Sequence, residues 1–208
     1  MCKNNILLDK LPTKVKIGGK FYNINSDFRA SILFELLMQD EDIEDELKIT
    51  QALKLYFPKI PPIKYIEETI NSIMWFYGCG NEKEDLNKRI RTTSGDLEQA
   101  YSFEYDNTYI YDAFMSQYKI DLSTVDNLHW WKFRALFEGL TEENTIIKIM
   151  NYRTMDLNKI EDKNERAFYK EKKEFFKLPK KISKADEEYK NNIEEMLMNG
   201  GVLNLEKL

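Results

Sequence analysis

Groups that carry out chemistry are scarce in this sequence. It holds one histidine, His129, and two cysteines, Cys2 and Cys79, which lie far apart. Metal centres and acid–base sites usually combine several such groups, and the sequence has no His-x-x-x-His, Cys-x-x-Cys or Glu-x-x-His motif. The glycine pair in "IGGK" lacks the spacing of a phosphate-binding loop. We therefore expect no enzyme, no catalytic residue, no metal site and no cofactor, and we interpret both cysteines as reduced thiols.

Turn-forming residues and long apolar runs are also limited. Eight glycines and five prolines leave little room for an all-β architecture, which needs many tight turns. No run approaches the ~18 apolar residues of a membrane-spanning helix, and the start of the chain has no signal-peptide pattern. We expect a soluble protein that binds no membrane and stays in the cytoplasm where it is made.

Positive charge is not in excess either. The chain has 31 basic and 36 acidic residues and a net charge of −5. Nucleic-acid binding usually needs a concentrated basic surface, so we do not expect nucleic acid as a partner. Aromatic residues, in contrast, are abundant, with twelve Tyr, twelve Phe and three Trp. Such side chains supply much of the buried area in cores and in protein interfaces alike.

The N-terminal part of the chain predicts a small sheet. In "VKIGGKFYNI", residues 15–24, apolar and polar side chains alternate around a glycine pair that suits a tight hairpin turn. Val15 and Ile17 point to one face of this hairpin, and we expect Phe21 to share it. A lone hairpin is only marginally stable and must pack on the rest of the protein. The segment "YSFEYD", residues 101–106, is a candidate third strand.

Helical spacing of apolar residues accounts for most of the remaining chain. Ser26 or Asp27 offers an N-cap to the first helix. Thr141 offers an N-cap to a later helix, whose positive end Glu142 and Glu143 would favour. The segments with helical character are 32–37, 49–56, 66–77, 107–118, 128–140, 141–155, 166–176 and 183–199.

These patterns predict a mainly α (α+β) fold. It consists of a compact helical domain with a small N-terminal β-hairpin or three-stranded antiparallel sheet, plus a C-terminal amphipathic helix. The domain covers residues 1–178, with the hairpin at about 15–24 and a polar loop at about 80–100. Residues 179–208 are expected to form a linker and the C-terminal helix.

The predicted terminal helix carries an apolar stripe with more than one possible binding surface. This stripe can fold back on the domain, pair with a partner or a second copy, or remain unattached. Methionine adapts to varied surfaces, which suits a chaperone-like contact. The stripe is formed by Tyr189, Ile193, Met196 and Leu197.

Two tryptophan-containing helices supply the other candidate binding residues. In "LHWWKFRALFEGL", residues 128–140, apolar side chains occupy two opposite arcs, with Trp131 on the smaller one. A helix that is apolar on two sides is usually a core helix, but Trp131 could instead serve a partner. Arg134 lies four residues after Trp130 and could stack on it. Trp75 lies opposite the apolar face of its helix and is either a second packing contact or an exposed anchor for a partner.

The order of several sequence blocks resembles a known phage family. These blocks include "LLDKLPTKVKIGGKFYNINSDFR", "LKLYFPKIPP", "MWFYGCG", "YSFEYDNTYIYDAF", "LHWWKFRALFEGL" and "KIMNYRTMDL". Together they resemble the bacteriophage gene product fifteen family, which occurs in tailed phages and prophages of Gram-positive bacteria. The resemblance runs from about residue 6 to about 178, and the segment from about 180 to 208 lies outside it.

The resemblance implies a role in tail assembly. Genes of this family lie with the tail genes, just ahead of the gene for the tape-measure protein, a position typical of tail assembly chaperones. It therefore implies a protein of the host cytoplasm that binds the tape-measure protein and tail-tube subunits, with self-association also open. The alternative is a structural tail or head–tail connector component that stays in the virion. The family brings no catalytic residues to carry over.

Overall fold

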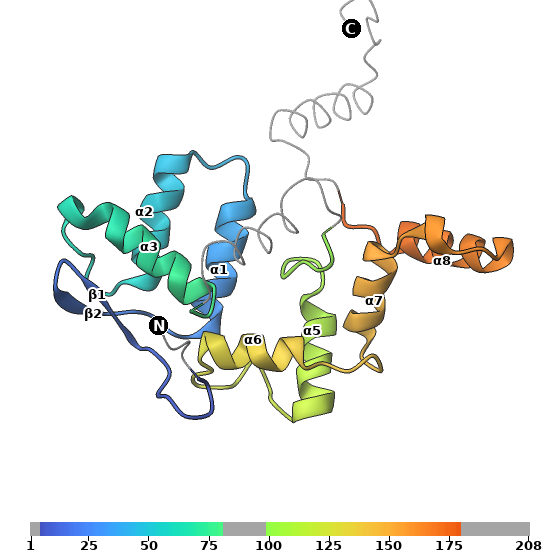
Figure 1. Cartoon of the computed structure of the whole chain (residues 1–208), viewed down its shortest axis with the longest axis horizontal. Coiled ribbons are helices and arrows are strands. Elements are labelled where there is room, and N and C mark those ends of the chain that lie inside the picture. Colours follow the sequence, from blue (N-terminus) through green and yellow to red (C-terminus); the bar gives the residue numbers. More distant parts are fainter. Residues whose placement is uncertain (1–4, 81–98, 180–208) are drawn as a thin grey trace, which may run out of the picture.

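The computed structural model describes residues 5–80 and 99–179. In these residues the chain forms a two-stranded antiparallel sheet and a set of mostly short helices (Figure 1). The strands are β1 (Lys14–Ile17) and β2 (Lys20–Asn23). The α-helices are α1 (Phe28–Gln39), α2 (Asp45–Tyr56), α3 (Ile66–Tyr77), α5 (Asn107–Ala113), α6 (Trp130–Glu138), α7 (Thr145–Thr154) and α8 (Lys163–Phe175). Shorter turns are η1 (Ile63–Tyr65), the π-helical η2 (Phe114–Tyr118) and η3 (Leu157–Lys159).

The predicted fold class is confirmed, but the third strand is not. The described chain is mainly α-helical with one N-terminal hairpin. Residues 101–106 form turns instead of a strand. Asp106 explains this, because its carboxylate accepts a hydrogen bond from the main-chain N–H of Ser102 at 2.8 Å and so closes a local turn.

The hairpin turns through Gly18 and Gly19, whose φ angles are +54° and +77°. Glycine is favoured at both positions because such angles strain other residues. The register places Phe21 opposite Lys16, on the outer face of the hairpin, and Phe21 is 72% exposed. The prediction that Phe21 shares the face of Val15 was therefore wrong, since the two-residue turn sets the alternation in β2.

One predicted helix start is confirmed and another is wrong. Asp27 caps α1 by accepting a hydrogen bond from the N–H of Arg29. Helix α7 begins after Asn144, not after Thr141. The Gln117 side chain accepts hydrogen bonds from the Thr141 N–H and the Asn144 amide, which holds the intervening segment in a turn. Glu142 and Glu143 consequently precede the helix.

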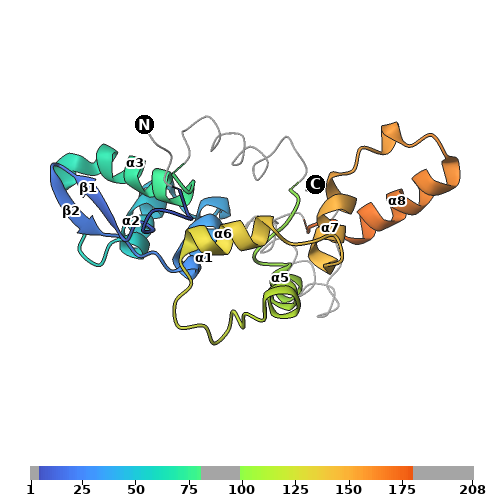
Figure 2. The ribbon, with the colours of Figure 1, turned by 60° about the horizontal axis from the view of Figure 1, so that its bottom comes forward.

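Helix α6 runs through the middle of the molecule (Figures 1 and 2). Its Phe133 is fully buried and stacks on Phe28 of α1 and Phe114 of η2, each with ring centroids 4.9 Å apart. Two backbone hydrogen bonds between the segments that precede α1 and α6 hold the starts of these helices together. The chain therefore folds around an aromatic centre, as the two apolar arcs of this segment predicted.

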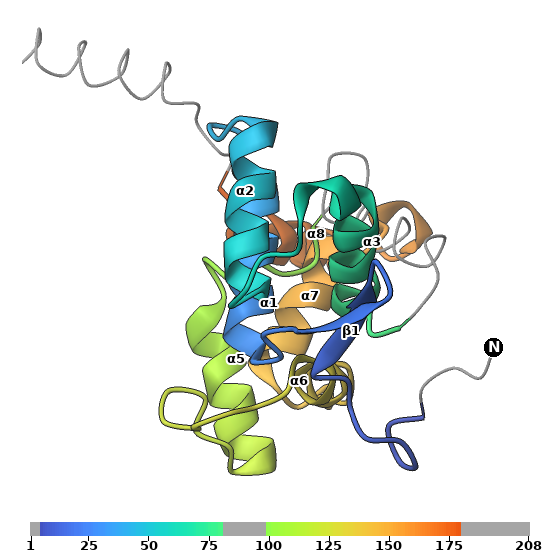
Figure 3. The same ribbon diagram turned by 90° about the vertical axis from the view of Figure 1, so that its left-hand side faces the viewer.

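The other elements lie on two sides of α6. The hairpin, α2 and α3 form one end of the molecule, and α7 and α8 form the other (Figure 1). Viewed from the hairpin end, β1 lies next to α3 (Figure 3). Helix α8 extends outward beyond α7 (Figures 1 and 2). Each helix in the described parts is too short or too polar to cross a membrane.

Candidate protein-binding surfaces

Trp131 lies in the core. Its side chain is only 4% exposed, and its indole N–H donates to the main-chain carbonyl of Phe76 at 2.8 Å. Trp130 does the same to the carbonyl of Tyr77. The paired tryptophans thus satisfy two carbonyls at the end of α3 that have no partner within their helix. The core interpretation is confirmed, and Trp131 offers no exposed ring to a partner in this structure.

Arg134 also has an internal role. Its guanidinium lies 5.6 Å from the ring centroid of Trp130, as the spacing predicted. It donates to the hydroxyl of Tyr101 at 3.1 Å and pairs with Glu138 at 2.9 Å. With 15% of its side chain exposed, Arg134 joins α6 to the segment before α5 more than it faces solvent.

A buried carboxyl group lies near this arginine. Glu35 of α1 is 4% exposed and accepts a hydrogen bond from the hydroxyl of Tyr77 at 2.5 Å. Burial raises the pKa of Glu35, while the Tyr77 hydroxyl and the positive charge of Arg134 oppose that rise. Burial also raises the pKa of Tyr101 to about 12, so this phenol stays protonated at neutral pH. The cluster is a buried polar network that connects α1, α3 and α6.

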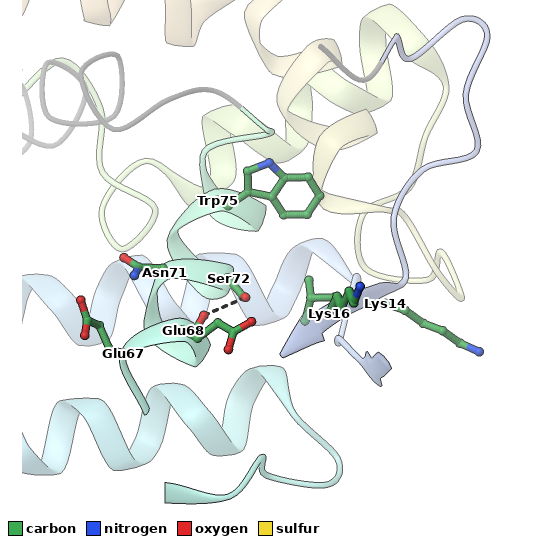
Figure 4. Close-up of a pocket in the computed structure, with 8 residues that line it drawn as sticks. Lys14, Lys16, Glu67, Glu68, Asn71, Ser72 and Trp75 are labelled. Atoms are coloured by element: carbon green, nitrogen blue, oxygen red, sulfur yellow. Dashed lines mark hydrogen bonds between the residues drawn. The ribbon is translucent and has the colours of Figure 1, made fainter. Parts of the chain in front are cut away.

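Trp75 differs from the other two tryptophans because it is half-buried. One edge packs on Trp131, with ring centroids 5.5 Å apart. The remaining surface lines a groove of about 550 Å³ between α3 and β1 (Figure 4). Trp75 therefore packs on the core and is also accessible from outside, and its role as an anchor for a partner stays a prediction.

The groove has charged walls (Figure 4). Lys14 and Lys16 of β1 lie along one wall, and Glu67 and Glu68 of α3 lie along the other. Glu68 bridges the two walls at one end, because its carboxylate accepts a hydrogen bond from the N–H of Gly18 at 2.9 Å. This accessible groove combines an aromatic ring with charges of both signs, a mixture suited to binding a peptide.

Helix α8 carries a second accessible apolar surface. None of its residues is buried. Tyr169 and the following Phe176 pack toward Tyr152 of α7, with ring centroids 6.2 and 5.9 Å away. Phe168 and Phe175 remain 48% and 78% exposed. Because they are seven residues apart they share one helical face, which we call the α8 face.

The sequence interpretation missed this face. Its signal was present in the sequence, since Phe168 and Phe175 repeat at helical spacing. A second aromatic pair, Tyr169 and Phe176, lies one position further along. The spacing could not show which pair packs on α7. Lys172 covers part of Phe168, with its ammonium 5.4 Å from the ring centroid.

The other predicted site residues lie outside the described parts of the chain. They form the stripe of the C-terminal segment, namely Tyr189, Ile193, Met196 and Leu197. Most of the polar loop predicted at about 80–100 also lies outside the described residues. Among the described residues, no group of three or more His, Cys, Asp or Glu side chains is placed to hold a metal ion.

Comparison with known protein families supports the resemblance seen in the sequence blocks. The family model described as Bacteriophage Gp15 protein matches residues 7–178. The match covers both the groove and the α8 face, and the chain belongs to this family of phage proteins. No curated protein and no solved structure matches the chain.

Proposed function

We propose that this protein is a phage tail assembly chaperone. In this role it acts in the cytoplasm of the bacterial host and catalyses no reaction. It binds the tape-measure protein through apolar side chains and assists the assembly of tail-tube subunits around that client. Membership of a phage family supports the phage context of the proposal.

The α8 face is the observation that carries this proposal. Two phenylalanines in solvent, on a helix that extends from the body, are unfavourable unless another surface covers them. An apolar stripe on one helix is suited to packing against an amphipathic helix of another protein. Charged side chains of both signs flank the stripe, with Glu165 and Glu171 among the acidic ones and Lys172 among the basic ones, so its apolar surface and not its charge would select the client helix.

Co-expression with the tape-measure protein of the same phage tests this function. We expect the two proteins to co-purify and the client to stay soluble. The double variant Phe168→Ser and Phe175→Ser should reduce the co-purified client several-fold without loss of folding, because both side chains are already exposed.

A matched control separates this effect from a general loss of apolar surface. Ile63 is 78% exposed, like Phe175, but lies in η1 at the hairpin end of the molecule. Ile63→Ser should leave the association unchanged. If the client is equally soluble alone and never associates, the chaperone proposal fails.

The second candidate function is a structural tail or head–tail connector component. The same exposed aromatic side chains would then form permanent contacts in the particle. The two functions differ in whether the protein remains in the finished virion.

A further inference from the structure

The hydrogen bonds of the hairpin alternate along β1. In an antiparallel pair with a two-residue turn, the residues that flank the turn exchange two hydrogen bonds, and every second pair repeats this. Ile17 and Lys20 flank the turn. Farther from it, the N–H of Ile24 donates to the carbonyl of Thr13 at 3.0 Å, which fits the same alternation. The pairs that lie between the bonded ones therefore direct their main-chain groups away from the partner strand.

Lys14 and Lys16 are the β1 residues in these intervening positions. Their N–H and C=O groups point to the free edge of β1, and in the described parts of the chain neither group forms a hydrogen bond. The same two residues line the groove in front of α3. The groove is thus bordered by a strand edge with two N–H donors and two carbonyl acceptors that are available for pairing.

From this geometry we propose that the groove binds an extended segment of a partner protein, which adds to the hairpin as a third strand beside β1. Main-chain hydrogen bonds to Lys14 and Lys16 would hold the segment in register. The cavity of about 550 Å³ lies within the range of ordinary ligand sites.

Charge complementarity indicates the chemistry of the partner. The lysine side chains at 14 and 16 are exposed on the outer face of the hairpin. Residues directly beside them on an added strand are favoured when acidic. The residue between these acidic positions turns to the face of Val15, where an apolar side chain can cover the accessible part of Trp75. The predicted segment therefore alternates acidic and apolar residues.

A second copy of this chain fits the edge less well. Pairing β1 with its own copy in an antiparallel arrangement would bring the lysines of both strands together, and like charges at facing positions are destabilising. The proposal does not depend on the tail-assembly function, because it concerns a different surface from the α8 face.

Binding of a synthetic peptide to the full-length protein tests the proposal. The probe is a short peptide in which glutamate and valine alternate, and its affinity is measured by fluorescence anisotropy. Lys16→Pro removes one outward N–H without removing a bond to β2 and should weaken binding roughly tenfold. Lys16→Gln keeps the N–H and should weaken binding less. Thermal unfolding of both variants establishes that the hairpin is intact.

Amide hydrogen exchange supplies an internal control. The peptide should slow exchange at the N–H groups of Lys14 and Lys16, which face the groove. It should change little at Val15 and Ile17, whose N–H groups already bond to β2. A peptide N-methylated on alternate residues should not bind, since its donors along one edge are lost.

Four results would overturn the proposal. The alternating peptide could bind no better than one in which lysine replaces glutamate. It could bind equally to the two Lys16 variants without slowing exchange at the strand edge. Deletion of residues 180–208 could raise peptide affinity many-fold, or sedimentation could show self-association that Lys16→Pro abolishes. Either of these last outcomes would assign the edge to the chain itself.

Discussion

The histidine at position 129 caps helix α6. Its Nδ1 accepts a hydrogen bond from the N–H of Trp131 at 3.1 Å, and its Nε2 lies 3.0 Å from the carbonyl of Pro12. This arrangement suits a neutral ring with its proton on Nε2, because a proton on Nδ1 would face another donor. Burial lowers the pKa of His129 below its ordinary value of 6.5.

This environment predicts a pH dependence of stability. Because the folded-state pKa is lower than the unfolded one, the unfolded chain binds the proton more readily. The contribution of His129 should be fully present above about pH 6.5 and decline as the pH falls toward the lowered pKa. His129→Asn keeps a capping side chain and should lose this part of the dependence.

Urea unfolding of wild type and His129→Asn, at about pH 7.5 and about pH 5.5, measures the effect. The stability difference between the two proteins should shift in favour of the variant at the lower pH. Comparing the two proteins cancels the titration of Glu35, whose raised pKa changes the stability in the opposite direction. A difference that does not change with pH would contradict the assigned tautomer.

At the scale of elements, one buried ion pair holds α8 in place. The guanidinium of Arg153 in α7 forms two hydrogen bonds with Asp106, at 2.5 and 2.9 Å, and both side chains are almost fully buried. The same guanidinium donates to the carbonyl of Phe176 at 2.6 Å and to that of Ala100 at 3.2 Å. Arg153 therefore joins the end of α8 to the segment that precedes α5.

Breaking this pair should be costly. Arg153→Met leaves the Asp106 carboxylate buried without its partner and should destabilise the protein by about 3–5 kcal/mol. Replacing both residues with apolar ones should recover most of that loss. The exposed pair between Lys177 and Glu174 is the matched control, since Lys177→Met should cost less than about 1 kcal/mol. Denaturant unfolding measures the stability of all three variants. Equal losses of stability for the buried and the exposed pair would contradict this account.

Periodicity in the sequence predicted the elements better than it predicted their ends and faces. The aromatic spacing around Phe133 identified a core helix, because residues that repeat every three or four positions must share a face. The start of α7 depends on Gln117, which is distant in sequence, so the local pattern at Thr141 could not reveal it. The outward position of Phe21 depends on turn register.

The candidate sites were likewise predictable from the sequence only in part. The sequence left Trp75 and Trp131 open between core packing and partner binding, and only tertiary packing decides that Trp131 is covered by the end of α3 while Trp75 keeps an accessible edge. The free edge of β1 follows from strand pairing, which no single segment encodes. The α8 face was visible as spacing, but the side that packs on α7 was not.

At the scale of the whole molecule, the two accessible surfaces lie at opposite ends. The groove beside β1 belongs to the hairpin end, and the α8 face belongs to the other end, with the aromatic core around α6 between them (Figure 1). A protein with a binding surface at each end could hold two protein segments at once. This arrangement is consistent with a protein that brings tail components together.

Quantitative mass spectrometry of purified phage particles and of the lysate they come from tests the central claim most directly. A chaperone should co-purify with the tape-measure protein from the lysate and be absent from finished particles. If the protein is instead present in finished particles at a fixed ratio to the tail-tube subunit, it is a structural component and the chaperone function is contradicted.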